Sequence, residues 1–291
     1  MTMRKRVQIA LAVVLLVILA GVTAWRGLRE QEPMCQGKPL SFWLRGYDLR
    51  PDFPDVGWSN AYRGRSDAYF PGGIRDWRTA DEVVDRLGTN AIPSLLRMIR
   101  AVDDPLEARL MRPLRRHRWV RSVPAWFRNF EAACAFERLG ENAKAGVPAL
   151  IKIYQEHRSA ESVIAAVRAL GSIGPPAEEA VPCLLNAVTS TNEAICCRAL
   201  SALGKIHARP GLVVPVLMRC LADPRASVRQ LAALSHGNFG KDAAPAIPAL
   251  LQLLNDGETL VEFFAARALE KIDPQSVPWA GVNTNGAGRG H

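Results

Sequence analysis

Apolar residues recur with a helical period along most of this chain. In two neighbouring stretches they fall at positions i, i+3, i+4 and i+7, which places them on one face of a helix. The two sets are Val163, Ala166, Val167 and Leu170, then Cys196, Ala199, Leu200 and Leu203. A glycine-containing turn and a second apolar stretch follow each set. The pattern predicts units of two helices.

These units repeat at a fixed interval. Five alanines are spaced by 33 residues: Ala133, Ala166, Ala199, Ala232 and Ala265. A proline series runs in step, with Pro182, Pro215 and Pro248 also 33 apart and Pro148 at 34 before the first. A period of this size marks a repeat array, in which each unit is too small to bury its apolar face alone and stacks on its neighbours.

The pattern predicts first helices of the units at residues 79–87, 127–139, 159–173, 191–206, 225–236 and 258–272. It predicts second helices at 91–100, 145–156, 179–189, 210–222 and 243–255. Proline is tolerated in the first turn of a helix, so the proline series marks where each second helix begins. Asp223 and Asp256 are placed to cap the following first helices. His236 replaces an expected leucine, which predicts a locally distorted unit.

The flanking segments differ from the array. We expect a basic tip at 1–6, an apolar anchor or signal segment at 7–25, and an irregular Pro/Gly/aromatic segment at 26–78. The solenoid of repeats then covers 79–273, with an insertion at 101–126, and a disordered tail follows at 274–291. The fold class predicted is all-α, a right-handed α-solenoid of about five to six two-helix repeats.

Residues 7–25 contain only two polar side chains, Gln8 and Thr23. A helix of about 20 apolar residues crosses a bilayer core of about 30 Å. Arg4, Lys5 and Arg6 precede the segment, which favours a cytoplasmic N-terminus and a body on the far side of the membrane. The alternative is a signal peptide cleaved near Ala24, which yields a secreted or periplasmic protein. Both interpretations export the body.

Composition adds little to this picture. The chain is 48% hydrophobic, with 37 basic and 28 acidic residues giving a net charge of +9, which favours anionic partners. Much of the excess is local rather than spread over the repeats. The six cysteines show no metal-site spacing, and we expect most to be buried core residues. They are Cys35, Cys134, Cys183, Cys196, Cys197 and Cys220.

Two stretches carry a family resemblance. DPRASVRQLAAL and GENAKAGVPALIKI resemble the HEAT-like repeats, in particular the short kind found in phycobilisome lyases. The resemblance covers about residues 79–273 and implies a solenoid whose second helices line the concave face. The Val-Arg pair of the family appears clearly only at Val228-Arg229, with Ile195-Cys196 and Val261-Glu262 at the equivalent places. The resemblance transfers fold and no activity.

The second helices supply the first candidate site. Four residues after each helix-B proline the residue is polar, and stacked repeats would align these positions into a column. The column is Arg97, Lys152, Asn186, Arg219 and Gln252. On a concave face it could hold an extended acidic peptide or another polyanion; the alternative is the solvated stripe of any amphipathic helix. The sequence thus predicts an exported scaffold that binds another protein.

The second candidate is a basic and aromatic stretch. Its residues are Arg112, Arg115, Arg116, Arg118, Trp119, Arg121 and Trp126. Such a mixture suits anionic lipid headgroups, an acidic partner or, as a peripheral polyanion binder through 112–128, nucleic acid. An exported body rarely meets nucleic acid, so lipid or an acidic partner is favoured. The alternative is an amphipathic helix with a solvated basic face.

Catalytic or cofactor chemistry has little support in the sequence. The five histidines are scattered without a paired cysteine or carboxylate, and no phosphate-binding loop is present, so we expect no enzyme activity, cofactor or metal. The alternative is an accessory lyase or chaperone-like protein. In that case an aromatic pocket would form beside the array from Trp58, Tyr62, Tyr69, Phe70 and Trp77.

Overall fold

A computed structural model describes residues 32–49, 76–103 and 123–275. Six helices form what we call the A row, one from each repeat and close to the predicted ranges. They are α5 (Trp77–Leu87), α8 (Ala125–Leu139), α10 (Ala160–Ile173), α12 (Glu193–Ile206), α14 (Ala226–Phe239) and α16 (Thr259–Ile272). The helical periodicity of the sequence is therefore confirmed in the described residues.

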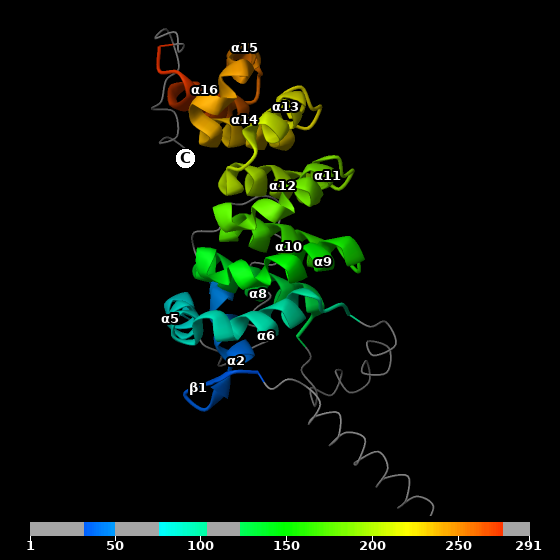
Figure 1. Ribbon diagram of the computed structural model, residues 1–291, viewed down its shortest axis with the longest axis vertical. Coiled ribbons are helices and arrows are strands. Elements are labelled where there is room, and N and C mark those ends of the chain that lie inside the picture. The colour runs from blue at the N-terminus through cyan, green and yellow to red at the C-terminus, as the bar shows by residue number, and fades with distance from the viewer. Residues whose placement is uncertain (1–31, 50–75, 104–122, 276–291) are drawn as a thin grey trace, which may run out of the picture.

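Five shorter helices form the B row. They are α6 (Ile92–Ile99), α9 (Val147–Glu156), α11 (Val181–Val188), α13 (Pro210–Cys220) and α15 (Ile247–Gln252). Short 3₁₀ turns lead into four of them: η2 (Gly88–Ala91), η3 (Gly140–Gly146), η4 (Pro175–Ala180) and η5 (Gly240–Ala246); a further turn, η6 (Leu253–Asn255), continues α15. Figure 1 shows the repeats stacked in sequence order along the long axis, with α9, α11 and α13 on one side of α8, α10, α12 and α14.

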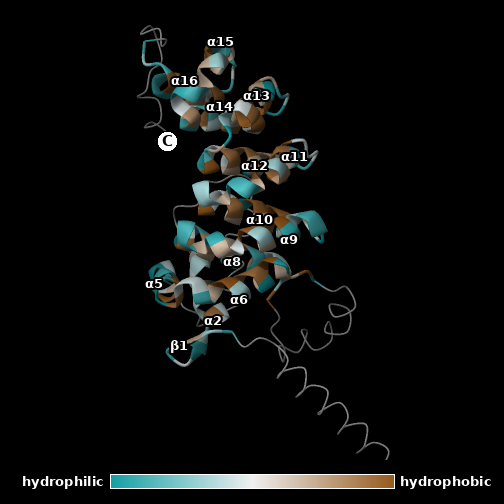
Figure 2. Cartoon of the chain, in the orientation of Figure 1, coloured by the Kyte–Doolittle hydropathy of each residue, from teal (hydrophilic) through white to brown (hydrophobic). Residues whose placement is uncertain are grey.

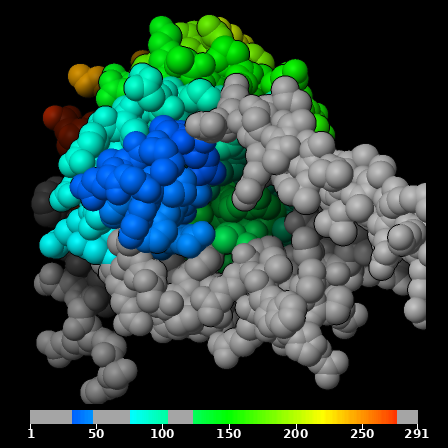
Figure 3. Space-filling view, turned by 90° about the horizontal axis from the view of Figure 1, so that it is seen from below, coloured from blue at the N-terminus to red at the C-terminus, as the bar shows by residue number. Residues whose placement is uncertain are grey.

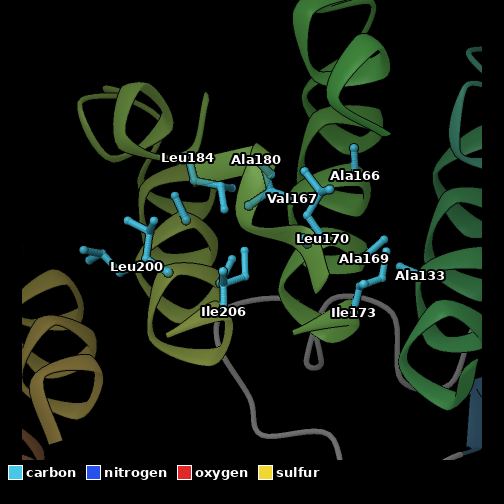
Figure 4. Packing of buried hydrophobic residues seen from close by; sticks show 14 of the residues in the cluster. Ala133, Ala166, Val167, Ala169, Leu170, Ile173, Ala180, Leu184, Leu200 and Ile206 are labelled. Atoms are coloured by element: carbon cyan, nitrogen blue, oxygen red, sulfur yellow. The ribbon is translucent and has the colours of Figure 1, made fainter. Parts of the chain in front are cut away.

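The core runs along the axis between the two rows. The five periodic alanines all lie inside it, each at most 1% exposed. Apolar side chains of successive repeats, such as Leu170, Leu184 and Leu200, fill the space between the helices (Figure 4). In Figure 2 the hydrophobic residues gather where helices meet, which is expected of units that bury their apolar faces only by stacking.

Small residues set the spacing within the A row. A Cβ atom added at Gly171 of α10 would lie 2.7 Å from the Cα of Ala202 on α12. One added at Gly204 would lie 2.8 Å from the Oγ of Ser235. One added at Gly237 would lie 3.1 Å from the Cα of Ala268. At Gly171 in particular, an added methyl group would force the helices apart, since protein interiors have no spare volume for it.

The same register holds an exposed glutamate in the last A helix. Gly171, Gly204 and Gly237 are spaced by 33 residues, and the next position in the series is Glu270. Within the described residues, α16 is the last helix of the A row.

The other end is covered by residues from the predicted irregular segment. A two-stranded hairpin, β1 (Met34–Cys35) and β2 (Lys38–Pro39), leads into α2 (Leu40–Trp43) and the 3₁₀ turn η1 (Leu44–Leu49). Figure 3 shows these residues lying over those of the first repeat. The Trp43 indole donates to the Cys35 carbonyl at 3.0 Å, and the buried Tyr47 hydroxyl donates to Asp81 of α5 at 2.7 Å. Part of the segment is thus regular, because its aromatic side chains close the end of the core.

Two sequence predictions about helix starts are wrong. Asp223 does not cap α14; it accepts from the backbone N–H and the guanidinium of Arg225, which itself begins the helix. Asp256 binds Arg229 instead of capping α16. Observed side-chain caps are Asp76 on α5, Ser159 on α10 and Asn192 on α12. Both aspartates bind an arginine instead of a helix end, because a guanidinium offers a carboxylate two charge-assisted hydrogen bonds.

Two further details differ from expectation. Pro215 lies inside α13 rather than at its start, because this helix begins earlier, at Pro210, where other repeats have a 3₁₀ turn. The unit with His236 is not distorted: α14 continues through it, and the fully buried ring places Nδ1 at 2.8 Å from the Ala232 carbonyl. A backbone carbonyl one turn back thus satisfies one ring nitrogen, which lets a histidine take the leucine position.

Several predictions fall outside the described residues. They concern the basic tip at 1–6, the apolar segment at 7–25, most of the insertion and nearly all of the tail. Within the three described ranges, no helix combines the length and the apolar composition needed to cross a membrane. The anchor at 7–25 therefore stays a prediction.

Candidate interaction surfaces

The polar column lies on the B row, one residue from each of its helices. Lys152, Asn186, Arg219 and Gln252 are exposed. Arg97 is intermediate, with 37% of its side chain accessible. Each of the five residues lies on a different B-row helix, and α9, α11 and α13 lie on one side of the A row (Figure 1). That the five side chains form one binding column stays a prediction.

Two members of the column have contacts within the chain. The Arg97 guanidinium lies 3.5 Å from the carboxylate of Glu32 and donates to Ser94 at 3.4 Å, so it helps hold the N-terminal segment. Asn186 of α11 hydrogen-bonds Tyr154 of α9, whose pKa is raised chiefly by burial. The side chains of Lys152, Arg219 and Gln252 form no hydrogen bond or ion pair with the described residues, so they are the most available of the five for contact with a partner.

An apolar line accompanies the column. Three residues after each B-row proline stands a half-buried aliphatic side chain: Leu96, Ile151, Leu185, Met218 and Leu251. The sequence showed these positions as apolar but gave no reason to separate them from the core. That these side chains are only half-buried can be recognised only from the positions of the neighbouring repeats in the structure.

Carboxylates near this surface are neutralised. No aspartate or glutamate stands three, four or seven residues after a B-row proline. Those at the eighth position are paired: Glu156 with Arg100 at 3.3 Å, Asp223 with Arg225 at 2.9 Å, and Asp256 with Arg229 at 2.7 Å. The B row thus presents aliphatic side chains beside amides and cations, without free acidic groups at these positions.

The A row carries a different polar pattern, in which arginines bind carboxylates of neighbouring repeats. Arg138 of α8 forms a two-point ion pair with Asp85 of α5. Arg168 of α10 donates to Glu137 of α8 at 2.8 Å. Arg229 of α14 donates two hydrogen bonds to the Asp256 carboxylate, at 2.7 and 2.8 Å, and a third to the Asp223 carbonyl at 2.8 Å. This explains the arginine of the Val-Arg pair: it joins one repeat to the next.

The basic and aromatic stretch lies mostly outside the described residues. Arg112, Arg115, Arg116, Arg118, Trp119 and Arg121 all fall there, so its role stays a prediction. Trp126 is described: it lies in the first turn of α8, half-buried and edge-on to Phe127 at 5.5 Å between ring centroids. Asp103 accepts from the Ala125 N–H at 2.8 Å, which ties the two flanks of the insertion together.

The aromatic pocket of the alternative hypothesis is also mostly outside the described residues. Of its five members only Trp77 is described, at the start of α5 and half-buried. The described aromatics nearest in sequence, Trp43 and Tyr47, pack into the core. The described part of the segment therefore supplies packing.

The cysteines are free thiols, five of them buried. Burial raises the pKa of both Cys183 and Cys196 to about 11, so these thiols stay protonated at neutral pH. Among the described residues no group of three or more His, Cys, Asp or Glu side chains is placed to hold a metal ion. The described thiols thus act as small apolar side chains.

A family model and two solved structures are similar to parts of this chain. A family model described as HEAT repeats matches residues 147–237. No curated protein matches the chain. Among solved structures, an engineered protein is 21% identical over 67% of this chain and 96% of its own, with a TM-score of 0.41. A designed armadillo repeat protein in complex with peptide (KR)4 is 14% identical over 80% of this chain and 99% of its own, with a TM-score of 0.44.

Stacked two-helix units with a 33-residue period, prolines that open most of the second helices, and a matching family model all describe the same architecture. Arrays of this class are typical of scaffolds that bind proteins along an extended surface. The central repeats, residues 147–237, match the HEAT-repeat family.

Proposed function

We propose that this protein is a membrane-anchored scaffold that binds a partner protein through its B row. The observation that carries the proposal is the B-row surface itself, a line of half-buried aliphatic side chains beside exposed polar ones. An extended partner segment can bury the aliphatic line and hydrogen-bond the column. Protein interfaces combine an apolar centre with a polar rim in this way.

The anchor is the apolar segment at 7–25, with the repeats on the far side of the membrane. Its length and the preceding arginines and lysine support this orientation. A tag at the C-terminus tests it. Protease should remove the tag from spheroplasts with an intact inner membrane, while the chain runs at full length on the same blot. A shortened chain would indicate a cleaved signal, and a protected tag would contradict export.

Site-specific photo-cross-linking in cells tests the binding surface. A photoreactive residue at Gln252 of the B row should give a discrete cross-linked product. The same residue at Lys205, exposed at the end of α12 in the A row, is the control and should not give that product. Products of equal yield from both positions would contradict the B-row assignment.

Charge reversal sharpens the test. Lys152→Glu with Arg219→Glu should reduce the Gln252 product at least several-fold, whereas Lys205→Glu should leave it unchanged. Both changed residues are exposed, so the fold is expected to persist, and circular dichroism checks this. An undiminished product from a folded double variant would exclude these two side chains from the contact.

A further inference from the structure

Arg198 of the A row binds no carboxylate among the described residues. Arg198 lies in the middle of α12 and is partly buried between its neighbours. No hydrogen bond or ion pair joins it to any residue of the three described ranges. By contrast, Arg168 and Arg229 of the same row each bind a carboxylate.

A second guanidinium lies close to Arg198. Arg168 of α10 has only 13% of its side chain exposed and packs over the Phe130 ring, 5.5 Å from its centroid. Burial, and then repulsion by Arg168, lower the pKa of Arg198. Glu137 is the nearby carboxylate, and it is already engaged with Arg168 at 2.8 Å. Arg168 and Arg198 thus lie beside the same carboxylate.

The thiol next to Arg198 in sequence does not supply the missing charge. Cys197 adjoins Arg198 in sequence and is buried, and burial raises its pKa, so it remains neutral at physiological pH. A partly buried guanidinium without a counter-ion costs free energy, since some of its hydration is lost without compensation. Among the described residues, no group meets this charge directly, so the arrangement is suited to receive an anion.

We propose that Arg198, with Arg168 beside it, binds a carboxylate side chain of a partner protein on the A row. The other A-row arginines named above are each paired with an aspartate or glutamate, so a carboxylate is the group that completes the series. The planar fork of arginine matches a carboxylate with two parallel hydrogen bonds. Phe130 gives the site an apolar edge, which suits a protein side chain better than a free ion.

This contact goes beyond the proposed function. It lies on the A row, whereas the column of Lys152, Arg219 and Gln252 lies on the B row. The two surfaces can bind different segments of one partner or separate partners, and each can be tested without the other.

Side-chain NMR of the full-length chain in detergent micelles tests the proposal. The Nε–Hε signal of Arg198 is identified by its disappearance in Arg198→Met. Three probes are then titrated at constant ionic strength: the blocked tripeptide acetyl-Leu-Glu-Leu-amide, its neutral counterpart acetyl-Leu-Gln-Leu-amide, and inorganic phosphate. The exposed Arg267, which already pairs with Glu270 at 3.7 Å, is the internal control.

The expected result is a saturable shift of the Arg198 signal with the glutamate peptide and none with the glutamine peptide, while the Arg267 signal stays in place. No shift, or equal shifts with both peptides, would overturn the site. A shift with phosphate at lower concentration than with the glutamate peptide would overturn the assignment to a protein side chain and indicate a free oxyanion site.

Stability separates binding from structure. Arg198→Met keeps the aliphatic stem and removes the uncompensated charge, so its Tm without any probe should equal or exceed that of the wild type. A marked loss of Tm would overturn the proposal, because it would show that Arg198 already has its stabilising partner within the chain.

Discussion

The two rows of helices differ in how they use side chains. The A row brings helices together through Gly171, Gly204 and Gly237 and links repeats with arginine–carboxylate pairs. The B row has larger aliphatic side chains left half-exposed and a polar column at its surface. The comparison teaches that one row fixes the geometry of the array while the other is available for contacts, and the following variants test that division.

The largest expected effect is that of a single methyl group in the A row. Gly171→Ala would place a Cβ 2.7 Å from the Ala202 Cα, so α10 and α12 must separate. We expect a loss of about 3 kcal/mol in the free energy of unfolding, as for overpacked cores. The matched change in the B row is Gly211→Ala in α13, where the added Cβ meets nothing within 4 Å.

Urea denaturation of both glycine variants decides the point. Gly211→Ala should be neutral or stabilising by up to about 1 kcal/mol, because alanine is the better helix former. If both variants lost stability equally, the spacing of the A row would not be set by its glycines.

The next effect concerns the side chain that joins the rows. Asn129 of α8 is buried, and its amide nitrogen lies 2.7 to 3.1 Å from three carbonyl oxygens at the end of α6. Asn129→Ala leaves these buried acceptors without a donor and should cost about 2 kcal/mol in urea denaturation. The exposed helix cap Asn192 is the comparison, and Asn192→Ala should cost about 1 kcal/mol. Equal losses would mean that Asn129 does no more than cap a helix end.

The stability of the fold should depend on pH through His236, a residue of α14 whose ring faces the Val214 backbone of α13. Burial lowers the pKa of His236 below its ordinary value of 6.5, so the unfolded chain binds a proton at higher pH than the folded one. The contribution of neutral His236 to the free energy of unfolding is therefore complete above about pH 6.5. It is lost as the pH falls below that value, by about 1.4 kcal/mol for each unit by which the folded-state pKa is lowered.

Urea midpoints at about pH 7.5 and about pH 5.5 measure this effect. The wild type should lose stability between them, and His236→Leu should lose distinctly less. An unchanged difference in the leucine variant would show that other groups cause the pH dependence.

The smallest effect on stability belongs to the B-row surface. Lys152→Met with Arg219→Met changes two exposed side chains and should alter the free energy of unfolding by less than about 0.5 kcal/mol per site. Thermal denaturation checks this. A loss well above that range would place these residues in the framework of the array instead of on its contact surface.

The repeat pattern predicted most of the described fold. The period of 33 residues located every A and B helix of the described ranges to within a few residues, since helical periodicity is a local property. It also identified the periodic alanines as core residues. It misplaced the roles of Asp223, Asp256 and Pro215, because those depend on where Arg225, Arg229 and the preceding turn lie in space.

Only part of the candidate surfaces could be predicted from the sequence. The column on the B row followed from counting residues after each proline. That Arg97 is bound to Glu32, or that Asn186 contacts Tyr154, could not follow, because each pair joins segments whose separation is fixed by stacking. Arg198 gave no signal at all, since its distinguishing feature is a missing partner on neighbouring helices.

The sequence by itself therefore determined the helices, their order and the faces they bury, because these depend on the spacing of apolar residues within each unit. Only the tertiary structure decided which glycine meets which alanine, which arginine finds a carboxylate, and which aliphatic side chains remain half-exposed. Those outcomes depend on the rigid packing of residues about 30 positions apart, where a shift of one turn would pair different side chains.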